Sequence, residues 1–264
     1  MTLLNQTVWH YRAAILNLAV LRLRVRYNNS ALGFLWSLGN PLFFMVVFTF
    51  VFTVLLDNAI PNYPIFALSA IMPWNFFSGA LLNIIASVPQ DRDLLTKLSF
   101  PREILPFASV LSDFINFGVA IIAITLILIV VGQGAGIVLL ALPLLMLILV
   151  LFTAGLGMLL ATVNVWFRDV QEIMSVLIFG WFFITPIVYS LDEIKADFNG
   201  LPVKQMLQIV NPMAGIISSF RQVLYAHEWP AWDIVGLAAA ISVVMFIIGL
   251  AVYHTFSPRF AEEV

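Results

Sequence analysis

Long apolar stretches alternate with short polar ones along most of this chain. The longest, residues 114–167, contains no charged side chain and is broken only by the glycine-rich turn at residues 132–136. A helix needs about 20 apolar residues to cross roughly 30 Å of hydrocarbon, so this stretch predicts two membrane-spanning helices joined as a hairpin. The pattern therefore indicates an integral membrane protein.

Cutting the rest of the sequence at charges and turn residues gives six spans in all. The predicted spans are residues 36–56, 65–88, 104–131, 137–163, 173–190 and 234–256. Composition agrees, because 62% of the residues are hydrophobic and only 10% are charged. We predict an all-α integral membrane protein with six transmembrane helices, an N-terminal amphipathic interface helix and outer re-entrant or gate helices between spans 5 and 6.

The distribution of Lys and Arg predicts which side each loop faces, because cytoplasmic loops retain positive charge. With the N-terminus inside, the inner basic residues are Arg12, Arg22, Arg24, Arg26, Arg92, Lys97, Arg102, Arg168 and Arg259. Only Lys195, Lys204 and Arg221 fall outside. Both termini are therefore predicted to be cytoplasmic. No cleavable signal peptide is expected, since the first apolar run is long enough to stay in the membrane.

Residues 1–30 form a predicted cytoplasmic amphipathic segment. Its apolar positions recur at helical spacing: Leu4, Val8, Tyr11, Ile15 and Leu18. Arg22, Arg24 and Arg26 add a basic end. We expect the segment either to lie along the inner membrane surface, with its arginines near anionic headgroups, or to be an ordinary basic flank.

The loop at residues 89–102 is predicted to be a short cytoplasmic helix. Pro89 suits its first turn, Asp91 and Asp93 suit the positive end of the helix dipole, and Lys97 suits the negative end. The helix has an apolar side where no membrane needs covering. We expect it either to dock on another protein or to pack against the cytoplasmic helix ends of its own chain.

Residues 191–233 are too many for a turn and too interrupted for two spans. Lys204, Pro212 and Arg221 divide them into pieces of about ten residues, a length typical of re-entrant or interfacial helices. The Asn211-Pro212 pair marks the bend between two such helices. Irregular backbone at membrane depth must be buried in protein or face a water-filled cavity, so we predict an outer vestibule or gate here.

Motifs for chemistry on this chain are missing. The sequence has no nucleotide-binding phosphate loop, no His-Glu-x-x-His pair and no cysteine, and its three histidines show no metal-ligand spacing. Asp113 is the one charge inside a predicted span, whereas a carrier coupled to protons or sodium usually needs more such groups. We expect Asp113 to pair with Arg102 or a neighbouring arginine.

Aromatic residues are abundant, with 23 Phe, 7 Trp and 6 Tyr. Two clusters stand on different spans: Trp74, Phe76 and Phe77, and then Trp181, Phe182, Phe183 and Tyr189. Each ring taken alone is expected to face lipid or to pack at the membrane interface. Taken as two sets, they are alternative candidates for the wall of a glycan pathway, because flat aromatic faces stack well on sugar rings.

Several short motifs follow one another along the chain. They are Arg26-Tyr27-Asn28-Asn29-Ser30-Ala31-Leu32-Gly33-Phe34-Leu35-Trp36 running on to Pro41, Lys97-Leu98-Ser99-Phe100-Pro101-Arg102-Glu103 with Pro106, Phe167-Arg168-Asp169, Thr185-Pro186-Ile187-Val188-Tyr189, Asn211-Pro212-Met213 and Phe220-Arg221. Through these motifs the chain resembles, over essentially its whole length, the membrane subunit of ABC-2 type exporters of lipid-linked O-antigen, capsular polysaccharide or teichoic acid. Thr185 stands where such subunits more often have Ser.

The resemblance implies that residues 31–264 form an ABC-2 type transmembrane domain in the cell inner membrane. Such a subunit is a permease and not an enzyme. Two copies pair with two copies of a separate ATPase, which carries ATP and Mg, so no cofactor, metal or nucleic acid is expected on this chain. Size also favours a homodimer, because six packed helices leave no lumen for a sugar chain, whereas a two-fold interface supplies one.

The resemblance also implies roles for individual residues. The ATPase-coupling residues would be Asp91, Arg92, Lys97, Phe100, Arg102, Arg168 and Asp169. The lipid headgroup would enter beside Arg22, Arg24, Arg26 and Tyr27. The candidates for the glycan pathway are Trp74, Phe77, Trp181, Phe182 and Tyr189. Residues 202–226 would form the outer gate helices, with Asn211, Pro212 and Arg221 as the gate candidates.

The leading hypothesis is export of a lipid-linked polysaccharide driven by a partner ATPase. One alternative is an ABC-2 exporter of a small lipid or drug. A secondary carrier or membrane enzyme acting alone would need more titratable groups in the spans than Asp113. A structural scaffold gives no account of the outer re-entrant segment.

Overall fold

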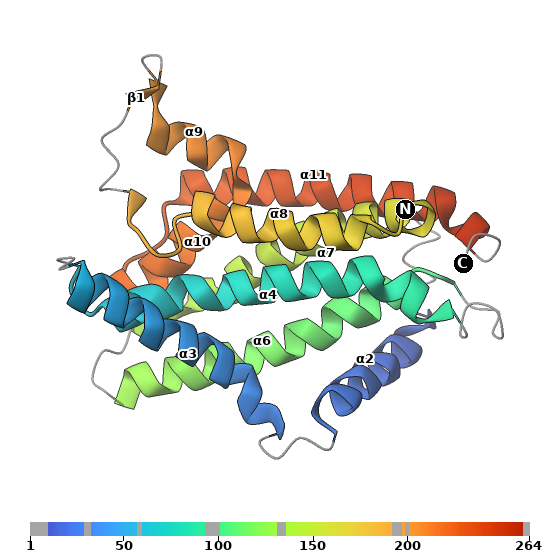
Figure 1. The fold of residues 1–264 in the computed structure, drawn as a ribbon, viewed down its shortest axis with the longest axis horizontal. Helices are drawn as coiled ribbons and strands as arrows, with labels where there is room; N and C mark the ends of the chain where they lie inside the picture. Colours follow the sequence, from blue (N-terminus) through green and yellow to red (C-terminus); the bar gives the residue numbers. More distant parts are fainter. Residues whose placement is uncertain are drawn as a thin grey trace.

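The computed structural model describes residues 10–28, 33–56, 60–92, 101–130, 136–191, 197–198 and 201–260, which form a helical bundle with one minimal strand pair (Figure 1). The helices are α2 (Arg12–Tyr27), η1 (Gly33–Leu35), α3 (Trp36–Thr49), η2 (Phe50–Leu55), α4 (Tyr63–Gln90), α6 (Ile104–Val130), η3 (Gly136–Ala141), α7 (Leu142–Trp166), α8 (Val170–Ile184), α9 (Val203–Val210), α10 (Pro212–Arg221), η5 (Gln222–Ala226), α11 (Trp232–Phe256) and η6 (Ser257–Arg259). Strand β1 (Asp197–Phe198) pairs antiparallel with β2 (Leu201–Pro202).

Five helical segments of the described chain are long and apolar enough to cross a membrane. They are Leu38–Leu55, Tyr63–Gln90, Ile104–Leu126, Gly136–Trp166 and Trp232–Arg259. Their bounds agree with five of the six predicted spans to within a few residues at most ends. Uninterrupted apolar length was therefore a sufficient signal for these five.

The predicted fifth span, residues 173–190, is a shorter helix. Helix α8 has 15 residues, ends at Ile184 and is followed by Thr185 in extended backbone with φ −84° and ψ 138°. Pro186 explains this end, because a proline disfavours helical backbone in the residue before it. At 1.5 Å per residue α8 is about 22 Å long, which is less than the hydrocarbon thickness.

Helices α4 and α7 form the centre of the bundle. Most residues of α4 are buried, whereas the apolar helix α3 has almost no fully buried residue and is exposed or half-buried along its length. Helix α11 lies against α7 in backbone contact, because a Cβ added to Gly249 would overlap the carbonyl oxygen of Gly155. Small residues allow such close approach between helices in membranes, where dispersion contacts drive the packing.

Helix α2 packs along the first half of α6 and runs in the same direction. Ile15 contacts Ile104 and Ala108 near the start of α6, and the Tyr27 hydroxyl donates to Asn116 further along. Tyr11 and Leu18 pack against the same cluster as Ile15. The apolar stripe predicted for this segment therefore faces protein in the described residues; Leu4 and Val8 lie outside them.

The first and last described helices meet the same end of the bundle. Arg22 of α2 forms an ion pair with Asp91, directly after α4. Arg102, just before α6, donates a hydrogen bond to the carbonyl oxygen of Ser257, directly after α11. Helix α9 and the strand pair stand apart at the opposite end (Figure 1).

Candidate functional site

A polar cavity of about 490 Å³ lies where the end of α2 and the start of α3 meet α4 and α6. It is lined by Arg26, Tyr27, Trp36, Asn40, Pro41, Met72, Asn75, Phe76, Gly79, Ala80, Asn83, Asp113, Asn116, Phe117 and Ala120. Four asparagines and Asp113 thus stand on the apolar helices α3, α4 and α6, and Arg26 of α2 faces the same cavity. Polar groups inside membrane segments are costly and usually functional, so this cavity is the candidate functional site.

An ion pair between Arg26 and Asp113 stands at the edge of the cavity. The Arg26 Nη1 atom lies 2.7 Å from Asp113 Oδ1, and Asn83 Nδ2 donates to Asp113 Oδ2 at 2.8 Å. The prediction that Asp113 pairs with an arginine is confirmed. The partner named first, Arg102, is wrong, because the guanidinium of Arg102 donates to Ser257 instead.

Neutral hydrogen-bonding groups and apolar residues together line the rest of the cavity. The Tyr27 hydroxyl donates to Asn116 Oδ1 at 2.6 Å. Burial raises the pKa of Tyr27, and the nearby Arg26 charge opposes that shift without cancelling it, so the phenol stays neutral. The Asn75 Nδ2 atom is buried with no hydrogen-bond partner among the described residues. Amides, a phenol and a guanidinium are groups that bind sugars and phosphates well.

Sequence reasoning named Arg26 and Tyr27 but missed the asparagines around them. A usable signal was present: Asn75 and Asn83 are eight residues apart and share one face of α4, while Asp113 and Asn116 are three apart on α6. Isolated amides in apolar spans do not interrupt hydropathy, which is why the division into spans passed over them.

The other two arginines predicted near a headgroup lie outside the cavity lining. Arg22 pairs with Asp91 and also donates to the Ser109 hydroxyl. Burial raises the pKa of Asp91, and the charge of Arg22 partly offsets that effect. Arg24 is exposed. It is two residues from both Arg22 and Arg26, so it lies on a different face of α2 from them.

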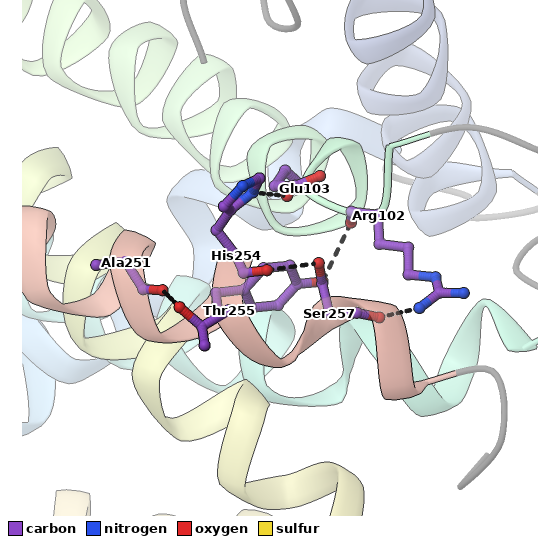
Figure 2. Close-up of polar contacts among 7 residues, drawn as sticks. Arg102, Glu103, Ala251, His254, Thr255 and Ser257 are labelled. Atoms are coloured by element: carbon purple, nitrogen blue, oxygen red, sulfur yellow. Dashed lines mark hydrogen bonds and ion pairs between the residues drawn. The ribbon is translucent and has the colours of Figure 1, made fainter. Parts of the chain in front are cut away.

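Arg102 and Glu103 join the start of α6 to the end of α11 (Figure 2). The Glu103 Oε1 and His254 Nδ1 atoms are 2.7 Å apart, and the Tyr253 hydroxyl donates to the Arg102 carbonyl oxygen at 3.1 Å. The Arg102 guanidinium donates to the Ser257 carbonyl oxygen. We call Arg102, Glu103, Tyr253, His254 and Ser257 the terminal clamp. Arg102 was predicted to couple to an ATPase, and in this structure it contacts the end of α11 in its own chain.

The other predicted coupling residues that the structure describes lie around the same end of the bundle. Asp91 and Arg92 follow α4, which continues through Pro89 to Gln90, so Pro89 belongs to the last turn of α4 and does not begin a separate helix. Arg168 and Asp169 are exposed in the turn between α7 and α8. Lys97 and Phe100 lie outside the described residues.

Replacing Arg102 by alanine is expected to loosen the end of α11. The Ser257 carbonyl would lose its charged donor, so amides of residues 253–260 should exchange with deuterium about tenfold faster. Hydrogen exchange read by mass spectrometry measures this. Arg259→Ala removes an exposed arginine from the same segment and serves as the control. Equal exchange in both variants would show that the terminal clamp does not hold α11.

Sequence motifs far apart in the chain meet at the opposite end of the bundle. Asn211 Nδ2 donates to Thr185 Oγ1 at 2.9 Å, and Trp181 Nε1 donates to Asn211 Oδ1 at 2.9 Å. Asn211 separates α9 from α10, as predicted for the bend, with Pro212 opening α10. Helix α10 is almost wholly buried.

Arg221 completes these contacts from the end of α10. Its guanidinium donates to the carbonyl oxygens of Ile187 at 2.8 Å and Tyr189 at 3.3 Å, and it lies 3.7 Å from the centroid of the Phe66 ring. The Tyr63 hydroxyl donates to the Val188 carbonyl oxygen at 2.9 Å. The irregular segment after α8 is therefore held by side chains from α4 and α10. We call Tyr63, Phe66, Trp181, Asn211 and Arg221, together with the segment 185–189 that they contact, the outer network, after the side on which the sequence predicts it.

The two aromatic clusters named from the sequence are in contact. The Trp74 and Trp181 ring centroids are 6.4 Å apart, and the Phe77 and Trp181 centroids are 5.2 Å apart. Trp74 is 4% exposed and Phe77 is fully buried, so these two rings pack in the core and offer no surface to a glycan in this structure. Trp181, Phe182 and Tyr189 are half-buried.

Comparison with known proteins gives consistent matches over most of the chain. Residues 14–225 match the ABC-2 type transporter family. The O-antigen export system permease protein RfbA of Myxococcus xanthus is 32% identical over 261 residues, covering 99% of each chain. The protein of that name from Klebsiella pneumoniae is 30% identical over 241 residues, which cover 91% of this chain and 90% of the relative. The polysialic acid transport protein KpsM of Escherichia coli is 20% identical over 236 residues, covering 88% and 89%.

These matches extend through both the cavity residues and the outer network. A family match over most of the sequence, together with relatives at least 30% identical over nearly the full length, shows that this chain belongs to the ABC-2 type transporter family.

Proposed function

We propose that this chain is the permease subunit of an ABC transporter that exports a lipid-linked polysaccharide of O-antigen, capsule or teichoic acid type. The observation that carries the proposal is the polar cavity, found on a chain that resembles O-antigen export permeases over its full length. Binding sites for drugs are lined mainly by apolar side chains. The four asparagines and the Arg26–Asp113 pair, which stand among the apolar residues of this cavity, favour a substrate with sugar or phosphate groups over a drug or small lipid.

The energy for transport would come from a separate ATPase subunit, which would hold ATP and Mg. The sequence has no phosphate-binding loop of its own. The exposed residues Arg168 and Asp169 lie at the end of the bundle where α4 ends and the terminal clamp begins, since Trp166 contacts Phe260 at 5.9 Å between ring centroids. This surface is our proposed docking site for the ATPase.

The permease would act as a homodimer with the glycan pathway at its two-fold interface. Helices α3 and α8 are both apolar and both largely exposed, and Phe48 stacks on Phe182 with centroids 5.8 Å apart, so they form one continuous face. Lipid and the second copy would share this face. The half-buried Trp181, Phe182 and Tyr189 keep their place as candidates for the pathway.

The topology in this proposal has six crossings in the cell inner membrane, with both termini in the cytoplasm. Helix α8 and the segment after it make the sixth crossing. An even number of crossings agrees with the first and last helices meeting one end of the bundle. Arg22, Arg102 and Arg168 give that end positive charge, as expected of a cytoplasmic side. The short helices α9 and α10 at the other end would then form the outer gate.

Native mass spectrometry of the subunit co-expressed with its genomic neighbours tests this function. The expected complex has two membrane subunits and two ATPase subunits and carries a co-purified polyprenyl-linked glycan. A complex with the ATPase that carries a drug-like molecule would favour the alternative exporter. A lone monomer that binds no ATPase would contradict the proposed function.

A further inference from the structure

We propose that the Arg26–Asp113 ion pair is a latch on the polar cavity, and that a diphosphate-linked glycolipid opens it by drawing Arg26 away from Asp113. The inference rests on the proposed function, because it assigns the headgroup of the exported lipid to this cavity. The two side chains of the pair differ in their exposure to solvent. The Arg26 side chain is 37% exposed, whereas the Asp113 side chain is 8% exposed.

Arg26 is the partner able to move. It stands at the end of α2, beside the cavity, with much of its side chain accessible. Its planar guanidinium can donate two parallel hydrogen bonds to a phosphate. Its ion pair with Asp113 joins one guanidinium nitrogen, Nη1, to one carboxylate oxygen, Oδ1. A phosphate that reaches the cavity therefore competes directly with Asp113 for the same group.

Asp113 keeps a hydrogen bond when Arg26 leaves. Arg26 contacts Oδ1 of the carboxylate, whereas Asn83 donates to the other oxygen, Oδ2. Removing one partner of a buried pair is costly mainly when the remaining charge has no other partner. Asn83 therefore lowers the cost of opening and makes exchange of partners possible within the folded protein.

The cavity also limits what can open the latch. A volume of about 490 Å³ suits a drug-sized group, so it has room for a diphosphate and its first sugar, with the rest of the glycan outside the cavity. Asn75 lines the cavity, and its Nδ2 donor is buried without a partner in the described structure, so a small rotation of this side chain would give such a group a hydrogen bond. Trp36 adds an aromatic residue to the lining.

Charge adds a criterion for selection. The phosphodiester of an ordinary membrane lipid carries one negative charge, as does the carboxylate that it would displace. A diphosphate diester carries two charges and gains more from the guanidinium. The latch would therefore stay closed against bulk anionic phospholipid and open for the diphosphate-linked substrate.

Binding to the intact transporter with its ATPase in lipid nanodiscs tests the latch. The probe is farnesyl diphosphate N-acetylglucosamine, a short lipid with the required headgroup. Asp113→Asn removes the competing charge and preserves an acceptor for Asn83, so it should bind the probe about fivefold more tightly than wild type. Arg26→Gln should bind it at least about tenfold more weakly. Arg12→Gln, which removes an exposed charge at the start of the same helix, should bind as wild type does.

A second comparison needs no variant and therefore does not depend on the folding of Asp113→Asn. Wild type should prefer the diphosphate probe to short-chain phosphatidylglycerol by about tenfold. Equal binding of the two lipids would overturn the latch. Inorganic pyrophosphate that bound as tightly as the glycolipid would assign the cavity to a soluble anion and would also overturn it.

The outcomes separate the latch from the function on which it rests. If wild type binds the probe but neither Asp113→Asn nor Arg26→Gln changes its affinity, the latch is wrong and the proposed function stands. If wild type binds no probe and carries no glycolipid in native mass spectrometry, both are wrong.

Discussion

Replacing Gly249 by alanine is expected to separate α7 from α11 and to destabilise the bundle by about 3 kcal/mol. The new methyl group would occupy the position of the Gly155 carbonyl oxygen, and neither helix has a flexible side chain there that can move aside. Thermal unfolding of the purified protein in detergent, followed by size-exclusion chromatography, measures the effect.

Gly236 supplies the matched control for this substitution. It lies on the same helix, α11, and a Cβ added there meets nothing within 4 Å. Gly236→Ala should leave the melting temperature unchanged or raise it slightly, because alanine favours helix over glycine by up to about 1 kcal/mol. If both alanine variants melted with the wild type, close contact between α7 and α11 would not be needed for stability.

Replacing Arg221 by leucine is expected to release the outer network. Two carbonyl oxygens would lose a charged donor, and the contact with Phe66 would lose its cation. Hydrogen bonds to charged groups contribute about 1.5 to 3 kcal/mol and a buried cation–π contact about 2 kcal/mol, and the two are not additive, so we expect a loss of about 3 kcal/mol. Export should fall at least about tenfold, since the outer helices lose their position.

Arg221→Lys separates the charge from the shape of this side chain. Lysine can keep a cation over the Phe66 ring, but its single ammonium does not match the fork with which Arg221 reaches both Ile187 and Tyr189. Its melting temperature and export should therefore fall between those of wild type and Arg221→Leu. An Arg221→Leu variant with wild-type stability would show that the outer network does not depend on this residue.

Hydropathy was enough to locate most of the helices. The predicted span at residues 104–131 is helix α6, Ile104–Val130, and the predicted span at residues 234–256 lies within Trp232–Phe256. Apolar length decides these boundaries, because a helix must cross the hydrocarbon layer whichever helices it packs against. At residues 173–190 the apolar run continued past Pro186, and hydropathy does not register the backbone limit that a proline sets.

The candidate site was predicted only in part, because it depends on packing between distant helices. Arg26 and Asp113 were both noticed, yet nothing local indicates that α2 runs along α6 and brings them together. Trp74 and Trp181 were expected to face lipid or pack at the membrane interface, or alternatively to line a pathway, and the sequence did not indicate that the two rings contact each other inside one subunit. Spacing identifies which residues share a face of a helix; it does not identify what that face meets.

The outer network also limits where segments of two related permeases can be joined in a chimera. Its side-chain to side-chain hydrogen bonds, from Trp181 to Asn211 and from Asn211 to Thr185, all fall between α8 and α10. Its hydrogen bond from Tyr63 of α4 ends on a backbone carbonyl, which any parent sequence supplies, and its other contact with α4, between Arg221 and Phe66, needs only an aromatic ring at position 66. A chimera of two relatives joined between α6 and α7 would therefore inherit these bonds from one parent. A junction between α8 and α10 would mix partners that have to match, so functional exchanges between exporters should avoid it.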